Sequence, residues 1–166
     1  NCVGKQIVQT EITQTKENIF YISKINKQNY LAFEDVINID TNGDEDYLYS
    51  IEVEKDLFLD SLFIKDMNDN VIELRQVQKK EVNNDDILFI KPFVHLPFES
   101  NPFKENIRKT IVDFPFAIEY KYVANIKILE GYEYEVPPNL NAVMQENDLI
   151  LKYSSSYLPE IKTLNI

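Results

Sequence analysis

Apolar and polar residues alternate with a period of two along much of this chain, a pattern that predicts β-strands with one face against a core. The alternation is strict over residues 49–54 and nearly so over residues 120–128. On this basis, or as short apolar runs, five segments are strand candidates: residues 49–54, 87–90, 120–128, 133–136 and 149–153. The chain is therefore predicted to consist mainly of strands.

Residues with turn chemistry separate these segments. Asn42-Gly43-Asp44 and residues 83–86 favour turns, because Asn, Asp and Gly tolerate left-handed backbone. Residues 68–70 have the same character. They lie between the apolar runs 58–64 and 71–74, so this part of the chain is predicted to form a β-hairpin.

Strand-sized runs recur about every 10–15 residues, and this spacing predicts an all-β fold, an antiparallel β-sandwich of two packed sheets. No long helix is predicted. Residues 44–55 could form one, but Ile51 and Val53 are β-branched and alternate with acidic residues. The acidic run 40–46 is the best candidate for a boundary. It would separate an N-terminal β extension, residues 1–40, from a β-sandwich domain, residues 41–166.

Composition agrees with this fold class and limits the partners. Ten Phe and ten Tyr, with no Trp and three Gly, favour strands, since aromatic side chains fit a pleated, half-buried surface. The net charge of −11 repels phosphate backbones, which argues against nucleic acid. No apolar run approaches the roughly 18 residues of a membrane helix, so membrane insertion is not expected.

Residues that could carry chemistry are few. His95 is the single histidine and Cys2 the single cysteine, so a Cys–His pair is formally available, whereas a zinc site would need more such ligands. His95 stands among apolar residues and is more simply explained as a hydrogen-bonded structural histidine. Cys2 could instead carry a lipid anchor, although Asn1 precedes it. No catalytic residue and no cofactor are predicted.

Part of the acidic run alternates as calcium ligands do: Asp40, Asn42, Asp44 and Asp46. An EF-hand loop has glycine at position 6 and glutamate at position 12. Counted from Asp40, this run has its glycine too early, at Gly43, and Ile51 in place of the glutamate. A solvated turn is the simpler interpretation, and no metal site is predicted.

Tyrosines provide the candidate binding surface. They lie on neighbouring predicted strands: Tyr120, Tyr122, Tyr132 and Tyr134. Together they could form a platform for a glycan or an extended peptide. Tyrosines at alternate strand positions are, however, more often part of a core, so this is the alternative function.

Proline–aromatic pairs mark the segment between residues 92 and 132. Because proline restricts the backbone, they predict an irregular connection between two strands. The residues of this structural motif are Pro92, Phe93, Asn101, Pro102, Phe103, Arg108, Asp113, Phe114 and Gly131. Within it, Arg108 and Asp113 are predicted to form an ion pair or to cap the backbone.

The order of these elements resembles a known family. Asn101-Pro102-Phe103-Lys104, Arg108, Val112-Asp113-Phe114 and the Gly131-Tyr132 turn are similar to the C-terminal β-sandwich domain of bacterial transglutaminase-like proteins. In those proteins this domain of unknown function follows a papain-like transglutaminase core. The resemblance covers about residues 45–153. Thr110-Ile111 departs from it, replacing an aromatic residue and proline, and the chain ends before the family's last strand and helix, which implies a truncated domain.

The resemblance also implies a role and a place. It implies an extracytoplasmic location, in the periplasm or at the cell surface of a Gram-negative bacterium. The family's catalytic residues belong to the core domain and none is matched here, so the implied role is that of a non-catalytic accessory domain. Its partner would be the transglutaminase-like catalytic domain, in the same parent chain or in trans.

Overall fold

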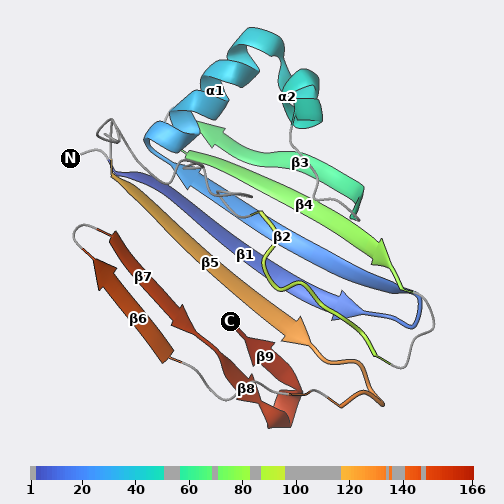
Figure 1. The fold of residues 1–166 in the computed structure, drawn as a ribbon. Helices are drawn as coiled ribbons and strands as arrows, with labels where there is room; N and C mark the ends of the chain where they lie inside the picture. The colour runs from blue at the N-terminus through green and yellow to red at the C-terminus, as the bar shows by residue number, and fades with distance from the viewer. Residues whose placement is uncertain are drawn as a thin grey trace, which may run out of the picture.

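The computed structural model of the protein describes residues 3–50, 57–68, 71–82, 87–95, 117–133, 135, 141–146 and 149–166 (Figure 1). Seven strands form one mixed sheet in the order β3-β4-β2-β1-β5-β9-β8. These strands are β1 (Gly4–Gln14), β2 (Asn18–Gln28), β3 (Phe58–Asn68), β4 (Val71–Glu81), β5 (Ile118–Lys127), β8 (Ser156–Leu158) and β9 (Thr163–Asn165).

Neighbouring strands of this sheet are antiparallel except β1 and β5, which run parallel. A separate two-stranded sheet consists of β6 (Asn141–Glu146) and β7 (Leu149–Ser154). The helices are α1 (Tyr30–Asn42), α2 (Asp44–Ser50) and the 3-10 turn η1 (Pro159–Ile161). Neither α1 nor α2 has the length and apolar character needed to cross a membrane.

The predicted fold, a two-sheet antiparallel sandwich, is wrong. The core lies on one face of the large sheet, and α1, α2 and the irregular segment 87–95 supply side chains that pack there. Alternation along a strand indicates that one of its faces is buried, but it does not distinguish burial under a second sheet from burial under helices. The strand pattern also could not predict that β1 pairs in parallel with β5, because the two strands are distant in sequence.

Helix α1 was missed, although its sequence contains the helical signal. Ala32, Val36 and Ile39 are spaced four and three residues apart and are all buried against the sheet. Helix α2 begins with three acidic residues, which are favourable at the positive end of the helix dipole. The predicted strand at residues 49–54 is therefore wrong at residues 49 and 50, and residues 51–54 lie outside the described part.

Several local predictions are confirmed. The hairpin forms as β3 and β4, the segment 120–128 forms most of β5, and the segment 149–153 forms most of β7. Gly131 has φ of 90° in a turn that Tyr132 closes by donating its N–H to the Leu129 carbonyl.

Two other strand predictions are wrong where the structure describes them. Residues 87–90 are not a strand but part of an irregular connection. Of residues 133–136, the two that are described, 133 and 135, are not in a strand.

The sheet draws strands from both sides of the predicted boundary at residue 40. β1 and β2, from residues 1–40, lie between β4 and β5, from residues 41–166. Helix α1 continues across residue 40 and ends at Gly43, whose φ of 91° suits glycine and whose N–H donates to the Ile39 carbonyl.

Two apolar clusters form the core, and both use the same face of the sheet, called here the core face. The first joins the helices to β1, β2 and β4 through Val8, Ile25, Ala32, Ile39, Tyr47, Ile72 and Leu74. The second joins the segment 87–95 to β1, β2, β5 and β9 through Ile12, Ile19, Tyr21, Val94, Ile126 and Leu164. A buried polar row, Thr10, Ser23 and Gln76, follows the strand register between them.

The one-sided burial of the sheet can be tested with a matched pair of isoleucines. Ile12 lies on the core face and is 0% exposed, whereas Ile22 lies on the opposite face and is 41% exposed. Ile12→Ala is expected to lower the free energy of unfolding by about 2–5 kcal/mol, because it leaves a cavity. Ile22→Ala is expected to lower it by less than about 1 kcal/mol. Denaturant titration measures both, and equal losses would indicate that both faces are buried.

Candidate functional site

Tyr122 is the point at which the irregular segment is joined to the sheet. Its hydroxyl lies 2.9 Å from the Pro92 carbonyl oxygen, to which it can donate, and it accepts the Val94 N–H at 3.0 Å. The Thr10 hydroxyl, at the centre of β1, is 3.1 Å away. One half-buried phenol thus satisfies backbone groups of the connection that would otherwise lose their hydrogen bonds to water.

The Pro92-Phe93 pair of the predicted motif packs on this tyrosine. The Phe93 ring meets the Tyr122 ring edge-on, with centroids 5.2 Å apart, and meets the Tyr153 ring of β7 at 6.4 Å. Phe93 therefore also links the β6–β7 hairpin to the main sheet. Six other motif residues lie outside the described part of the chain: Asn101, Pro102, Phe103, Arg108, Asp113 and Phe114.

The other predicted binding tyrosines have different surroundings. Tyr120 is on the same face of β5 as Tyr122 but remains 38% exposed, and partial burial together with the nearby Glu34 carboxylate raises the pKa of its phenol. Tyr132 is half-buried beside the Gly131 turn. Tyr134 lies outside the described residues. The Tyr122 hydroxyl, by contrast, bonds the Thr10 side chain and the backbone of Pro92 and Val94.

Those residues considered for chemistry that the structure describes are not gathered into one place. His95 is half-buried at the end of the segment 87–95, with φ of 64°, and Cys2 lies outside the described part. The acidic set of the calcium interpretation is divided between the last turns of α1 and the start of α2, and it is exposed to solvent. Among the side chains that are described, no three His, Cys, Asp or Glu converge as metal ligands would.

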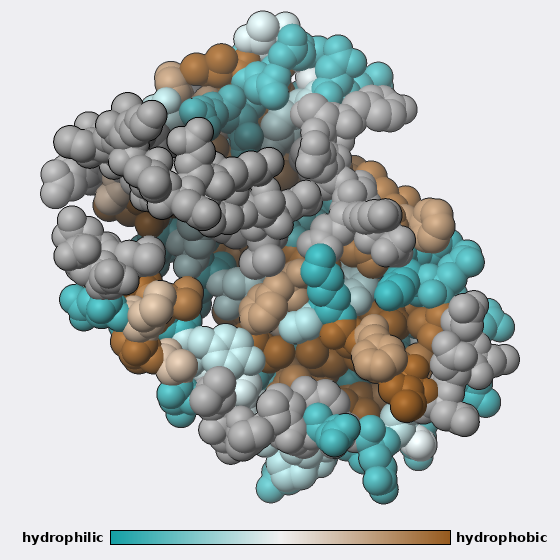
Figure 2. Space-filling model, viewed as in Figure 1, coloured by the Kyte–Doolittle hydropathy of each residue, from teal (hydrophilic) through white to brown (hydrophobic). Residues whose placement is uncertain are grey.

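The β6–β7 hairpin exposes large apolar side chains on both of its faces. Met144 and Leu151 pair across one face and are 51% and 57% exposed, while Val143 and Ile150 project from the other face and are also exposed. Figure 2 shows hydrophobic side chains gathered over this hairpin, at the lower left of the view. Apolar groups in such numbers on one small element are typical of a surface that another protein covers.

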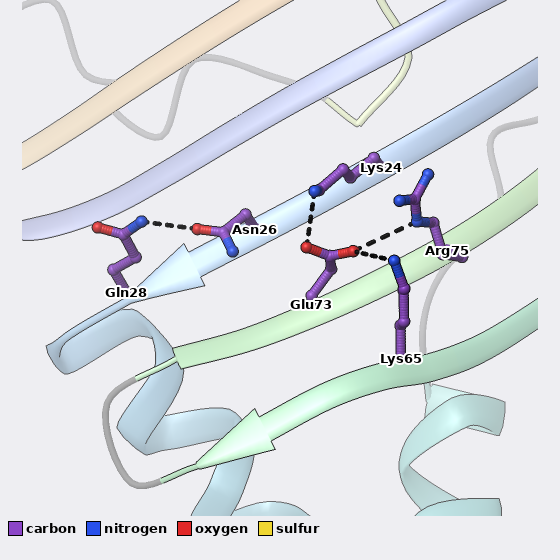
Figure 3. A network of polar contacts seen from close by, with 6 residues as sticks. All are labelled: Lys24, Asn26, Gln28, Lys65, Glu73 and Arg75. Carbon is purple, nitrogen blue, oxygen red and sulfur yellow. Dashed lines mark hydrogen bonds and ion pairs between the residues drawn. The ribbon is translucent and has the colours of Figure 1, made fainter.

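A cluster of charged side chains lies on the face of the sheet opposite the core, called here the open face. The Glu73 carboxylate of β4 lies 2.8 Å from the Lys24 ammonium of β2 and 3.3 Å from Nε of Arg75. Lys65 of β3 approaches the same carboxylate at 3.6 Å (Figure 3). Three neighbouring strands thus direct cations at one acidic group.

This environment changes the acidity of Glu73. The hydrogen bond from Lys24 lowers the pKa of the Glu73 carboxyl below its ordinary value of 4.5, and the charges of Lys24, Lys65 and Arg75 act in the same direction. Sequence analysis did not single out this cluster. Glu73 and Arg75 stand at alternate positions of one strand, but the partners on β2 and β3 become visible only once the register is known.

A second ionic contact fixes the helices to the core face. The Lys27 ammonium of β2 lies 2.6 Å from the Asp35 carboxylate of α1. Tyr47 of α2 is buried in the same region, and burial together with the Asp35 carboxylate raises the pKa of its phenol. These groups orient α1 and α2 over the sheet.

Comparison of the chain with protein families, with curated proteins and with solved structures gives no match. The resemblance to the C-terminal domain of transglutaminase-like proteins therefore stays a prediction.

Removing the Tyr122 hydroxyl should weaken the attachment of the segment 87–95. Tyr122→Phe is expected to lower the free energy of unfolding by about 1–3 kcal/mol, because partly buried backbone groups lose their partner. Tyr153→Phe is the matched control. It keeps the ring contact with Phe93 and should change stability by less than about 0.5 kcal/mol. Chemical denaturation distinguishes the two, and a neutral Tyr122→Phe would contradict the assigned role.

The Glu73 cluster predicts a specific pH dependence. A carboxyl whose pKa is lowered by folding stabilises the protein above its ordinary pKa of 4.5, and the contribution disappears as the pH falls through the lower folded value. Glu73→Gln should therefore be less stable by about 1 kcal/mol at neutral pH, and the difference should vanish in acid.

The control for Glu73→Gln is Glu119→Gln, since Glu119 is more exposed and is paired with Lys5 at 3.3 Å. Its effect should be smaller at every pH. Thermal unfolding curves from neutral to acid pH provide the comparison. A difference between Glu73→Gln and the wild type that does not change with pH would rule out the electrostatic explanation.

Proposed function

We propose that this protein is a non-catalytic accessory module that holds a partner domain, and that the β6–β7 hairpin is its docking element. The partner proposed is a transglutaminase-like catalytic domain, in the same parent chain or in trans, outside the cytoplasm of a Gram-negative bacterium. The observation that carries the docking role is the exposure of large apolar side chains on both faces of the hairpin.

The isolation of the hairpin supports a docking role. β6 and β7 pair with each other in a sheet of their own, and a two-stranded hairpin is at best marginally stable in water. The contact of Tyr153 with Phe93 ties one side of it to the connection that precedes β5. Burial of its other apolar side chains under a partner would stabilise it, since each such side chain contributes about 1.5–3 kcal/mol when fully buried.

The identity of the partner is supported by sequence resemblance alone, through the spaced motif between residues 92 and 132. The alternative, a glycan- or peptide-binding platform of tyrosines, is weaker. Tyr122 uses its hydroxyl to hold the Pro92 and Val94 backbone, so it is unavailable to a ligand unless that contact breaks.

A double substitution tests the docking element. Met144→Lys with Leu151→Lys places two charges on one face of the hairpin and should weaken binding to the proposed transglutaminase-like partner domain by more than about tenfold. Isothermal titration calorimetry measures the affinity. Stability should change by less than about 1 kcal/mol, because both positions are exposed.

The matched control changes two exposed apolar residues elsewhere, as Ile87→Lys with Ile161→Lys. This variant should bind the core domain as the wild type does. Equal losses in the two double variants would refute the hairpin as the docking element. A wild-type protein that does not bind the core domain would refute the proposed partner.

A further inference from the structure

The open face of the sheet is cationic, although the chain as a whole carries a net charge of −11. The strand registers place on it the cations Lys5, Lys24, Arg75, Lys79, Lys121 and Lys127, with Lys65 joining them at Glu73. The acidic residues that β1, β4 and β5 contribute to the same face are Glu11, Glu73, Glu81 and Glu119. Cations therefore outnumber acids on these strands.

Apolar side chains accompany these cations. Phe63 of β3 lies opposite Arg75 in the register and is 50% exposed. Ile22 of β2 lies beside Lys24 on the same face and is also exposed. We call the region formed by Ile22, Lys24, Phe63, Lys65 and Arg75 the cationic patch. The elements of the described chain that cover the sheet, α1, α2 and the segment 87–95, pack on the opposite face.

Helix α1 has an uncovered apolar stripe of its own. Phe33 and Ile37, one helical turn apart, are each about half exposed, and Tyr30 precedes them on the same side. They project away from the stripe of Ala32, Val36 and Ile39 that is buried against the sheet. A helix with apolar residues on two opposite sides is typical of one that is covered on both.

The charge around this outer stripe is negative. The segment 30–50 contains six acidic residues and neither lysine nor arginine: Glu34, Asp35, Asp40, Asp44, Glu45 and Asp46. Asp35 is already paired with Lys27, while the other five are exposed. The helical layer thus combines apolar side chains with acids, as the cationic patch combines them with cations.

From this complementarity we propose that the outer side of α1 in one copy of the protein lies on the cationic patch of a second copy. Phe33 and Ile37 would pack beside Ile22 and Phe63, and exposed carboxylates of the helical layer would approach Lys65 and Arg75. A helix of 13 residues is about 20 Å long, which the 11-residue strands of the sheet can accommodate.

The two surfaces are on opposite sides of the sheet, so the contact is head-to-tail. A heterologous contact of this kind continues from copy to copy rather than stopping at a dimer, unless the copies close into a ring. The proposal goes beyond the docking function, because it uses α1 and the open face and leaves the β6–β7 hairpin free.

The experiment measures the size of the purified protein by sedimentation velocity. The average mass of the wild type should rise steadily with concentration, and should fall towards that of the monomer in about 1 M salt, where the screening length is only about 3 Å. A protein that remains monomeric at every concentration in low salt would overturn the proposal.

Blocked variants test which surfaces meet. A helix-blocked variant carries Phe33→Asp with Ile37→Asp, and a face-blocked variant carries Ile22→Asp with Phe63→Asp. Each should be monomeric alone. An equimolar mixture should form dimers of one copy of each and nothing larger, because each variant keeps the surface that the other lacks. Circular dichroism and thermal unfolding verify that both are folded.

Controls separate this proposal from the docking function. Ile161→Asp, which changes an exposed residue outside both surfaces, should assemble as the wild type does. Met144→Lys with Leu151→Lys should also assemble normally, whereas the helix-blocked and face-blocked variants should still bind the core domain. A mixture of the two blocked variants that stays monomeric, or assembly that depends on the hairpin, would overturn the head-to-tail contact.

Discussion

Burial of a single face of the large sheet is the constraint on which the rest of this structure depends. Each strand presents its apolar side chains in register with those of its neighbours, so Val8 and Ile12 of β1 meet the apolar positions of β2 and β5 on the same side. Where the register brings the polar side chains of Thr10 and Ser23 together, they bond each other at 3.0 Å. The Tyr122 hydroxyl bonds both the Thr10 hydroxyl and the Pro92 carbonyl, and so joins the irregular segment to this part of the core.

The same constraint explains which surfaces of this protein remain exposed for binding. A sheet covered on one side leaves the other to charged residues, and here those charges form the Glu73 cluster and the wider cationic patch. The hairpin and the outer side of α1 are the apolar surfaces that the core does not use. The docking role and the head-to-tail contact between copies are therefore separate proposals. The first uses the β6–β7 hairpin, and the second uses the outer side of α1 and the cationic patch.

Polar groups stabilise this protein on both faces of the sheet. On the core face, Lys27 and Asp35 hold a helix against the sheet, and the Tyr122 hydroxyl satisfies the Pro92 carbonyl. On the open face, Glu73 remains partly accessible, and its cations lower its pKa without isolating it from water. The carboxylates of the two ionic contacts are similarly exposed, 16% for Asp35 and 13% for Glu73, so both contacts are expected to weaken as salt screens them.

The sequence by itself determined β3, β4, β5 and β7, through alternation or short apolar runs next to turn residues, and the turn at Gly131, because these depend on neighbouring residues and on local backbone preference. It also contained the spacing of Ala32, Val36 and Ile39 that marks α1. Tertiary structure alone decided that helices rather than a second sheet cover the core face, that β1 lies parallel to β5, and that Lys24 and Lys65 converge on Glu73. These features depend on which distant segments meet, and hydrophobic periodicity reports only that a side chain is buried, not what buries it.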